Sequence, residues 1–373
     1  MSRAEAIIDL SALEYNIERL LSGVKSEGLA VVKADAYGHG LVPVAKRALT
    51  AGVKWLGTAL LEEAITLREA QIEAPLIAWL TPISDDFESA LQNRIDLAIP
   101  SLEHLNSVLL ASEKTGVTPR IHLEVDTGMS RGGALSDWNS LVATSSELAK
   151  KGKLEVIGIW SHFARADEPD NSFNEEQLRN FHARVSEART LGITPKLLHL
   201  SNSAAALTNQ SANFDLVRLG IAMYGLSPDV KTLGDSEVLN LRPVMKLRAR
   251  LHLVKDVPAG SQVGYGGTAV TNSDTKLGVV AMGYADGVPR NANSIAGVLV
   301  GNKKAPIIGR VSMDQFVVDL GNDSIARTGD WAYLIGSEGG DGYTADAWAK
   351  ASATINYEIV TRIGPRVPRV FLD

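Results

Sequence analysis

Eight short apolar segments alternate with longer amphipathic segments between residues 29 and 219, and this alternation limits the possible folds more than any other feature. Each apolar segment is four to eight residues long, rich in Ile, Val and Leu, and mostly free of internal charge, with Asp96, Glu124 and Glu155 as the exceptions. Strands that are buried on both faces of a parallel sheet have this composition. The predicted strands span residues 29–33, 55–59, 75–80, 95–100, 120–126, 154–161, 196–200 and 215–218.

The amphipathic segments between these strands predict helices, for example over residues 43–51, 60–70 and 101–115. Ser101 is a good N-cap for the last of these helices, and Gly116 follows its final turn. Eight strand–helix units in succession predict a closed (β/α)8 barrel of the TIM type. An open doubly wound sheet is the competing fold, but the Gly-x-Gly-x-x-Gly turn that it usually carries does not follow the first strand.

The pattern changes near Pro243, beyond a connection at about residues 227–242. Short strands separated by turn residues follow, with a single helix predicted over residues 344–352. The C-terminal part is therefore predicted to be a mostly β domain. Its expected strands span residues 244–257, 277–283, 297–300, 305–309, 315–320 and 331–336.

The overall composition argues against several kinds of partner. The chain has 373 residues, a net charge of −6 and scattered basic residues, whereas nucleic acids and acidic membranes require a concentrated basic surface. It contains no cysteine, which excludes disulfides, thiolate nucleophiles and cysteine-based metal sites. No apolar run is long enough for a membrane span or a signal peptide, so we expect a cytoplasmic protein that acts on a small molecule.

Polar and ionisable residues follow five of the eight predicted strands. Because the active site of a parallel α/β barrel lies at the carboxyl ends of its strands, these residues are expected at one rim. A histidine there is as often a hydrogen-bonded core residue as a catalyst, and both interpretations stay open for His162 and His199. The segments concerned are residues 33–40, 124–131, 161–162, 199–203 and 218–221.

Lys33 and a predicted phosphate cradle suggest the chemistry. Lys33 ends the first strand, and a lysine that points into a barrel has a lowered pKa and forms imines readily, although most lysines at strand ends are simply solvated. Ser203, Gly220 and Ile221 follow the last two strands, where barrels commonly bind phosphate through backbone N–H groups. A phosphate site combined with such a lysine suggests an enzyme that uses pyridoxal 5′-phosphate.

Residues 31–40, with the sequence Val-Val-Lys-Ala-Asp-Ala-Tyr-Gly-His-Gly, closely resemble the cofactor-lysine motif of alanine racemases. The resemblance continues through further motifs along nearly the whole chain. These motifs occupy residues 126–131, 199–203, 218–225, 264–266, 283–287, 309–314 and 355–358.

The resemblance implies a homodimeric enzyme that interconverts L-alanine and D-alanine with pyridoxal 5′-phosphate and supplies D-alanine for peptidoglycan. The barrel is expected over residues 11–235. The second domain is expected over residues 236–373 and to include an N-terminal strand within residues 1–10. Each active site would lie at a head-to-tail dimer interface.

The resemblance also implies a role for each site residue. Lys33 would carry the cofactor and act as one catalytic base, and Tyr265 from the partner subunit would act as the other. Arg218 would bond the pyridine nitrogen. His162 would orient Tyr265. The substrate carboxylate would be bound by Arg131 and by the backbone of Met313. The implied phosphate ligands are Tyr37, Ser203, Gly220, Ile221 and Tyr357, with Asn202 also against the cofactor, and the residues implied to line an access channel are Asp167, Tyr284, Arg290 and Arg310.

Two positions depart from a common form of the motif. Many relatives have a lysine modified to a carbamate where this chain has Glu124, which we expect to hold Arg131 with a permanent negative charge. Many also have a cysteine where this chain has Ser312, so a role for that thiol is in doubt.

Three alternatives remain at this point. A broad-specificity or serine racemase of the same fold would share most of these residues. A metal-dependent barrel hydrolase would use His39, His162, His199 and Asp126, but it would not explain Lys33 beside a phosphate cradle. A non-catalytic cofactor carrier would have no need of Tyr265 as a second base.

Overall fold

The structure is a computed structural model that describes residues 2–338 and 341–373. The chain divides into two compact units. The barrel unit contains residues 13–36 and 41–242, and the β unit contains residues 37–40 and 243–373 together with the described residues up to Ala12. No helix among the described residues is both long and apolar enough to cross a membrane.

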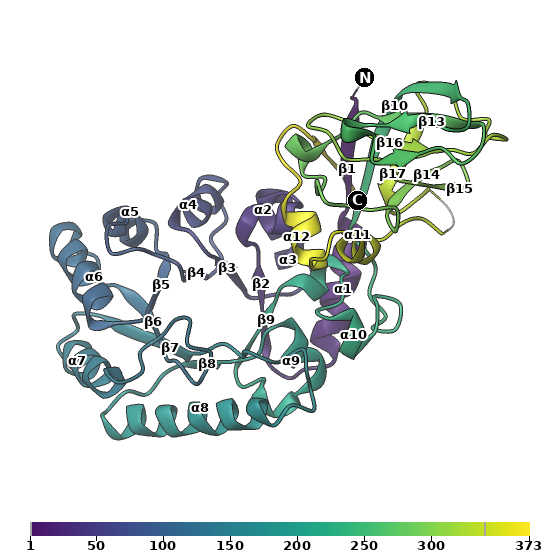
Figure 1. Cartoon of the computed structure of the whole chain (residues 1–373). Coiled ribbons are helices and arrows are strands. Elements are labelled where there is room, and N and C mark those ends of the chain that lie inside the picture. Colours follow the sequence, from purple (N-terminus) through teal and green to yellow (C-terminus); the bar gives the residue numbers. More distant parts are fainter. Residues whose placement is uncertain (1, 339–340) are drawn as a thin grey trace. The chain divides into compact units, whose positions relative to one another are not determined.

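The barrel unit is built on eight parallel strands, which confirms the predicted fold (Figure 1). Their order in the sheet is β8-β7-β6-β5-β4-β3-β2-β9. The amide of Asp215 donates to the carbonyl of Leu198 (3.1 Å), and that of Arg218 to the carbonyl of Ser201 (3.0 Å), so backbone bonds link β8 to β9 and almost close the ring. The strands are β2 (Glu27–Val31), β3 (Trp55–Thr58), β4 (Leu76–Ala78), β5 (Asp96–Ile99), β6 (Arg120–Glu124), β7 (Glu155–Trp160), β8 (Leu197–His199) and β9 (Leu216–Leu219).

Helices surround this ring of strands (Figure 1). The predicted N-cap is confirmed, because the Ser101 hydroxyl accepts a hydrogen bond from the amide of His104 (3.3 Å). Gly116 ends the same helix with a φ of +70°. The helices are α1 (Leu10–Ser22), α2 (Lys33–Gly38), α3 (Leu41–Thr50), α4 (Leu61–Glu69), α5 (Phe87–Gln92), α6 (Leu102–Thr115), α7 (Trp138–Lys150), α8 (Ser172–Thr190), α9 (Ser203–Thr208) and α10 (Val230–Leu233), with short turns η1 (Gln210–Ala212) and η2 (Ile221–Tyr224).

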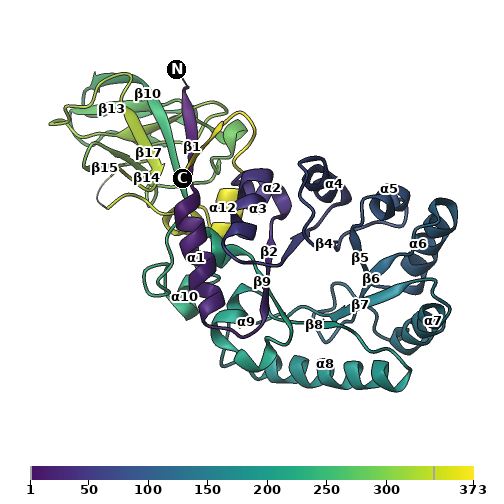
Figure 2. The ribbon, with the colours of Figure 1, turned by 180° about the vertical axis from the view of Figure 1, so that it is seen from behind.

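The β unit is a mostly antiparallel sheet in which β1 (Ala4–Asp9) lies between β10 (Met245–Val257) and β18 (Arg369–Leu372) (Figure 2). Alternate residues of β1 are buried, as expected for a sheet with one face packed on the core. The predicted strand over residues 305–309 is shifted, because its backbone pairs as β15 (Lys303–Pro306). The remaining elements are β11 (Gln262–Val263), β12 (Ala269–Val270), β13 (Thr275–Val280), β14 (Gly297–Val300), β16 (Phe316–Asp319), β17 (Trp331–Ile335), α11 (Ala345–Ala351), α12 (Asn356–Thr361), η3 (Tyr265–Gly267) and η4 (Tyr284–Asp286).

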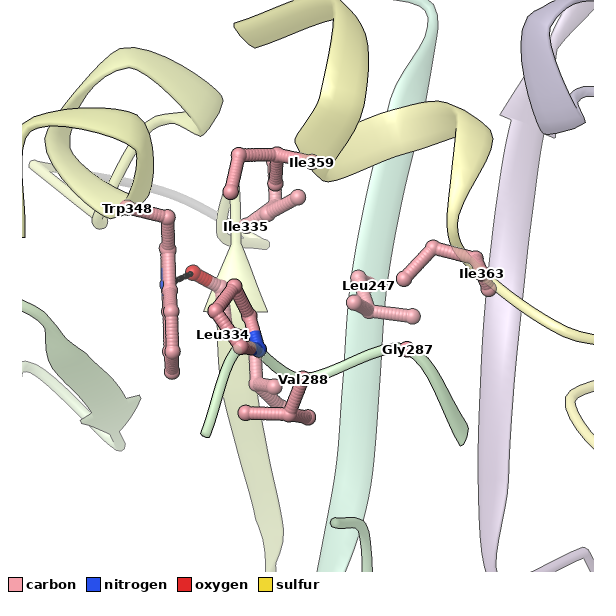
Figure 3. Close-up of a pocket in the computed structure, with 9 residues that line it drawn as sticks. Leu247, Gly287, Val288, Leu334, Ile335, Trp348, Ile359 and Ile363 are labelled. Atoms are coloured by element: carbon pink, nitrogen blue, oxygen red, sulfur yellow. Dashed lines mark hydrogen bonds between the residues drawn. The ribbon is translucent and has the colours of Figure 1, made fainter. Parts of the chain in front are cut away.

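The core of the β unit contains a small apolar pocket (Figure 3). Trp348 anchors it, because its indole N–H donates to the carbonyl of Leu334 (2.6 Å). No titratable side chain lines the pocket, so it is part of the core and not a catalytic site. Its lining residues are Leu247, Gly287, Val288, Pro289, Leu334, Ile335, Trp348, Ile359 and Ile363.

The segment after β2 has an unusual backbone that the sequence did not predict. Ala34, Asp35, Ala36 and Tyr37 all have φ between +52° and +54°, so α2 is a left-handed turn. Such a conformation costs an L-residue roughly 1 to 2 kcal/mol. The turn is held locally, because Asp35 accepts a hydrogen bond from the amide of Leu41 (2.8 Å). Strain of this kind is characteristic of functional sites.

Replacing Ala34 by glycine should therefore stabilise the protein by up to about 1 kcal/mol, because glycine adopts positive φ without steric cost. Ala143 is a matched control, since it is also exposed but lies in the right-handed helix α7. Ala143→Gly should destabilise the protein by about 1 kcal/mol. Urea unfolding of both variants measures the two changes, and equal signs would contradict the strain argument.

Candidate active site

The carboxyl ends of five barrel strands bring the predicted barrel residues to one rim. Glu124 and His199 are the last residues of β6 and β8, and Arg218 lies in β9. Lys33 and His162 each follow the end of their strand by two residues. The sequence prediction of strand-end side chains at one rim is therefore confirmed for these five.

Arg218 is buried, and its guanidinium is the most extensively bonded group of the rim. Its Nη1 donates to the carbonyl of His199 (3.0 Å), and its Nη2 donates to the carbonyls of Ser161 (2.9 Å) and Leu200 (3.0 Å). The ring of Trp160 lies 5.2 Å from the guanidinium carbon. Burial lowers the pKa of Arg218 to about 9, so it stays protonated at neutral pH. Its Nε–H has no acceptor among the described residues and can donate to a ligand.

His162 is a neutral neighbour of this cation. Its Nδ1 lies 3.2 Å from Nη2 of Arg218, and arginine is only a donor, so Nδ1 accepts and Nε2 carries the proton. Burial, and then the charges of Arg218, Arg131 and Lys33, hold the pKa of His162 well below its usual value. The histidine therefore presents an N–H group without adding charge.

Lys33 is half-buried, and its environment favours the neutral amine. Burial, followed by the charge of Arg131, lowers its pKa, while Glu63 opposes the shift. Glu63 also fixes the local backbone by accepting hydrogen bonds from the amides of Ala34 (2.5 Å) and Ala59 (3.0 Å). Sequence reasoning missed Glu63, because it lies on α4 and nothing in the sequence relates it to the first strand.

Glu124 differs from the expectation of a permanently charged partner for Arg131. Burial raises its pKa to about 7, although Arg131 and Arg218 oppose that shift. Within the described part of the chain no ion pair joins Glu124 to Arg131, whose side chain is exposed. The carboxylate instead lies beneath Gly132, where a Cβ would be 2.8 Å from Oε1. Arg131 is thus an electrostatic neighbour of Glu124 without a direct contact.

The predicted phosphate residues that follow β8 and β9 converge on one hydroxyl. The buried Ser203 Oγ accepts hydrogen bonds from the amides of Gly220 (2.8 Å) and Ala222 (3.4 Å), at the start of η2, which Ile221 begins. Asn202 caps α9 by accepting from the amide of Ala205 (3.1 Å). The backbone amides of Gly220 and Ala222 are therefore aimed at an oxygen, as a phosphate site requires.

The β unit places two more predicted phosphate residues together. The rings of Tyr37 and Tyr357 are 6.2 Å apart and tilted by 44°. Tyr37 is buried, which raises its pKa to about 12, so its hydroxyl remains a hydrogen-bond donor. Tyr357 lies on α12.

The other predicted residues of the β unit are exposed. Tyr265 is 71 % exposed, Met313 54 % and Tyr284 40 %. Two loops hold the last two residues near each other, because the amide of Tyr284 donates to the carbonyl of Ser312 (3.0 Å) and that of Ala285 to the carbonyl of Met313 (2.9 Å). Gly266, next to Tyr265, packs against Arg310, since a Cβ there would be 3.3 Å from Nη1. Arg290 is exposed, and in the barrel unit the carbonyl of Asp167 accepts from the hydroxyl of Thr232 (2.5 Å).

Asp286 organises these two loops, and sequence reasoning gave it no role. It is buried and accepts hydrogen bonds from Arg3 Nη2 (2.5 Å) and from the amide of Gly283 (3.0 Å). Arg366 lies 3.2 Å from the same carboxylate and also donates to Asp314 (2.7 Å), which follows Met313. The motif at residues 283–287 marked the segment, but its arginine partners are far away in the sequence.

The residues of the hydrolase alternative do not form a metal site. In the described residues no three His, Asp or Glu side chains are grouped so that they could hold a metal ion. His39 instead bonds the carbonyl of Tyr37 through Nδ1 (2.9 Å). Asp126 accepts from the amides of Gly128 and Ser130 and so shapes its own loop.

Fold and site together define a barrel enzyme with a mostly β second unit, in which a lysine with a lowered pKa shares a rim with a buried arginine. Comparisons with known proteins specify this class. Residues 8–228 match the model of the alanine racemase N-terminal domain, and residues 244–371 match that of the C-terminal domain. The chain belongs to the alanine racemase family, whose members are isomerases that act on amino acids.

Relatives and solved structures agree with this family along the full length. The alanine racemase of Salinispora arenicola is 47 % identical over 373 residues, covering 100 % of this chain and 99 % of the relative. The alanine racemase structure from Streptomyces lavendulae, a D-cycloserine producer, is 45 % identical and superposes with a TM-score of 0.97 over 100 % of this chain and 98 % of its own. That from Bacillus anthracis with bound L-Ala-P is 36 % identical, with a TM-score of 0.89 over 100 % and 96 %.

Glu124→Gln should stabilise the protein at pH 8 but not at pH 4.5. A carboxyl whose pKa is raised by folding destabilises the folded state as it ionises, so the penalty is absent below about 4.5, grows through the interval and is complete above about 7. The gain at pH 8 is on the order of 2 kcal/mol. Guanidinium unfolding at both pH values measures it. The exposed Glu113→Gln is the control, and a pH-independent effect at Glu124 would contradict the burial argument.

Proposed function

We propose that this enzyme interconverts L-alanine and D-alanine, with pyridoxal 5′-phosphate bound to Lys33 and with Tyr265 of the partner subunit as the second base. The proposal rests on the family and on one observation above all. The charges of Lys33, Arg131 and Arg218 all lower the pKa of His162, so these four side chains share one site.

The residues at this rim suit pyridoxal 5′-phosphate. When bound, the cofactor would acidify the Cα–H bond of an attached amino acid by delocalising the electron pair. Lys33 is suited to hold it because its pKa is lowered. Arg218 can donate Nε–H to the pyridine nitrogen, and a donor-only group favours an unprotonated ring nitrogen. Ser203 accepts from the amides of Gly220 and Ala222, which leaves its own O–H to donate to a phosphate oxygen.

Racemisation requires a proton to leave one face of Cα and another to arrive on the opposite face. A single side chain cannot serve both faces, because proton transfer needs donor and acceptor within roughly 3 Å. Lys33 would serve one face and Tyr265 the other. The 71 % exposure of Tyr265 supports a supply in trans, since a reactive aromatic that stands in solvent is suited to be covered by a second subunit.

The substrate carboxylate would be bound by Arg131 and by the backbone amide of Met313. The Ser312 carbonyl, which belongs to the same peptide unit as the Met313 N–H, accepts from the amide of Tyr284 (3.0 Å), and this bond fixes the direction of the peptide. Glu124 would moderate the positive potential of Arg131 and Arg218 without contacting Arg131. We expect the loops that carry Tyr284 and Met313 to limit the size of the substrate side chain. A serine racemase is the second candidate, because the same loops could admit a hydroxymethyl group.

The purified protein should be yellow, should racemise L-alanine, and should do so faster than L-serine. Lys33→Ala should lose the yellow colour of cofactor attached through Lys33, and its kcat should fall by at least about 1,000-fold. Both effects are expected because the substitution removes the attachment point and one base. Lys54→Ala is the control, since Lys54 is an exposed lysine of the same barrel. Preference for L-serine would favour the second candidate, and a colourless wild-type protein without racemase activity would exclude both.

Mixing Lys33→Ala with Tyr265→Ala subunits tests the supply of the second base in trans. If subunits exchange randomly, half of the dimers are hybrids with one intact site, so activity should return to about a quarter of the wild-type value. Each variant alone should be inactive in racemisation, while solvent-deuterium exchange of one alanine enantiomer persists in the tyrosine variant. No recovery on mixing, despite subunit exchange measured by mass spectrometry, would refute a shared site.

A further inference from the structure

Three buried polar side chains continue inward from Arg218 through the interior of the barrel. Asp96, His122 and His199 come from β5, β6 and β8, and each is at most 1 % exposed. β5 and β8 are otherwise apolar, and β6 carries further charge only at its two ends, at Arg120 and Glu124. Burying a polar group costs free energy unless it is hydrogen-bonded. Hydrogen bonds join the three side chains to Arg218 in the order Asp96, His122, His199, and we call this chain the relay. Packing of the core alone does not explain why polar groups are buried here.

The imidazole protons along this chain of hydrogen bonds have one consistent arrangement. Nη1 of Arg218 lies 3.3 Å from Nδ1 of His199, and because arginine only donates, this Nδ1 must accept. The proton of His199 is therefore on Nε2, which lies 3.0 Å from Nδ1 of His122. His122 then accepts there and carries its own proton on Nε2, 3.4 Å from Oδ2 of Asp96.

Asp96 fixes the end of the hydrogen-bond chain that lies opposite Arg218. Arg120 donates to it twice, from Nε to Oδ1 (2.7 Å) and from Nη2 to Oδ2 (3.0 Å). The ion pair occupies both oxygens of Asp96, and a carboxylate can only accept from His122. If the histidine protons were reversed, His199 would present an N–H to the N–H of Arg218, which is repulsive.

Packing holds the two imidazoles in these orientations. The ring of Trp160 stacks on His199 with centroids 5.8 Å apart and an angle of 6°, and Trp55 contacts the edge of His122 at 5.5 Å. Gly158 is required beside them, because a Cβ there would come within 2.5 Å of Nδ1 of His122. Burial, and then His122 and Arg218, hold the pKa of His199 well below its usual value, so this ring stays neutral.

We infer that Asp96 is a positioning residue that acts through His122 and His199 to fix the Arg218 guanidinium. The inference rests on the proposed function only in that Arg218 is taken to face the cofactor. With the Nδ1 lone pair of His199 held toward it, Arg218 keeps Nη1 and Nη2 bonded inward and leaves Nε–H for the ligand. Arg120 begins β6, so a pair at the amino end of the strands supports the chemistry at the carboxyl end. That end of a barrel usually serves stability.

Asp96→Asn tests this assignment, because an amide of the same shape can direct its NH2 group at His122 and reverse both tautomers. The holoenzyme is labelled with 15N in its histidine rings, and the ring nitrogen shifts report which nitrogen carries the proton. His122→Phe and His199→Phe spectra assign the signals. We expect Nε2–H on both histidines in the wild type, and a changed or mixed tautomer on at least one in Asp96→Asn.

Kinetics of the same variant separate positioning from a structural role. We expect kcat for alanine to fall by about 10- to 100-fold, with KM changed less, because Arg131 and Met313 are untouched. Val142→Ala is the matched control, since it removes buried volume in α7, which carries none of Asp96, His122 and His199. It should lower the melting temperature without altering the histidine tautomers or kcat. If Asp96→Asn does not fold, His122→Phe removes the same link and should lower kcat alike.

Unchanged tautomers together with unchanged kcat, in a wild-type enzyme that is yellow and racemises alanine, would overturn the role of Asp96 alone. A wild-type protein that binds no cofactor would instead overturn the proposed function. The 15N ring shifts of His122 and His199 would still test whether Asp96 sets the tautomers of the two histidines.

Discussion

The buried guanidinium of Arg218 is the constraint on which the rest of the barrel site depends. A cation in the interior is tolerable only if acceptors surround it, and three main-chain carbonyls at the ends of β7 and β8 supply them. Those carbonyls lie at the rim only because the eight strands almost close into a ring. Burial, together with this cation, holds the pKa values of His162 and His199 well below their usual value, and both rings turn Nδ1 toward Arg218.

The positive charge at this rim explains what its other members can do. Burial, and then the charge of Arg131, lower the pKa of Lys33, and the same two causes lower that of Arg218, so the rim favours a neutral amine at Lys33. Glu124 is the nearby acid, and its raised pKa shows that burial outweighs the attraction of two arginines. A rim of this kind attracts anions such as a carboxylate or a phosphate while keeping its amine reactive.

The sequence predicted the strands of the barrel well because each is largely apolar, which is the signature of burial on both faces. It also predicted which strand ends carry polar groups. It could not predict the left-handed turn at Ala34–Tyr37, since neither alanine nor tyrosine favours positive φ and only the folded surroundings impose it. Nor could it relate Asp286 to Arg3 or Asp96 to His199, because those partners are joined by three-dimensional contact alone. The pKa of Glu124 was missed for the same reason, as burial is a property of the fold.

The barrel unit and the β unit hold their predicted site residues in different physical ways. The barrel supplies buried groups whose orientation is fixed by several bonds each, as in Arg218 and Ser203. The β unit supplies exposed side chains on loops. The positions of these loops are fixed by the buried carboxylate of Asp286 and its two arginines. Tyr265 has neither kind of support within its own unit, since glycines with positive φ flank it on both sides. A base that must approach a substrate to roughly 3 Å cannot remain so free. In the proposed mechanism the partner subunit completes this orientation, so we expect dimer formation to be a condition for positioning the proposed second base.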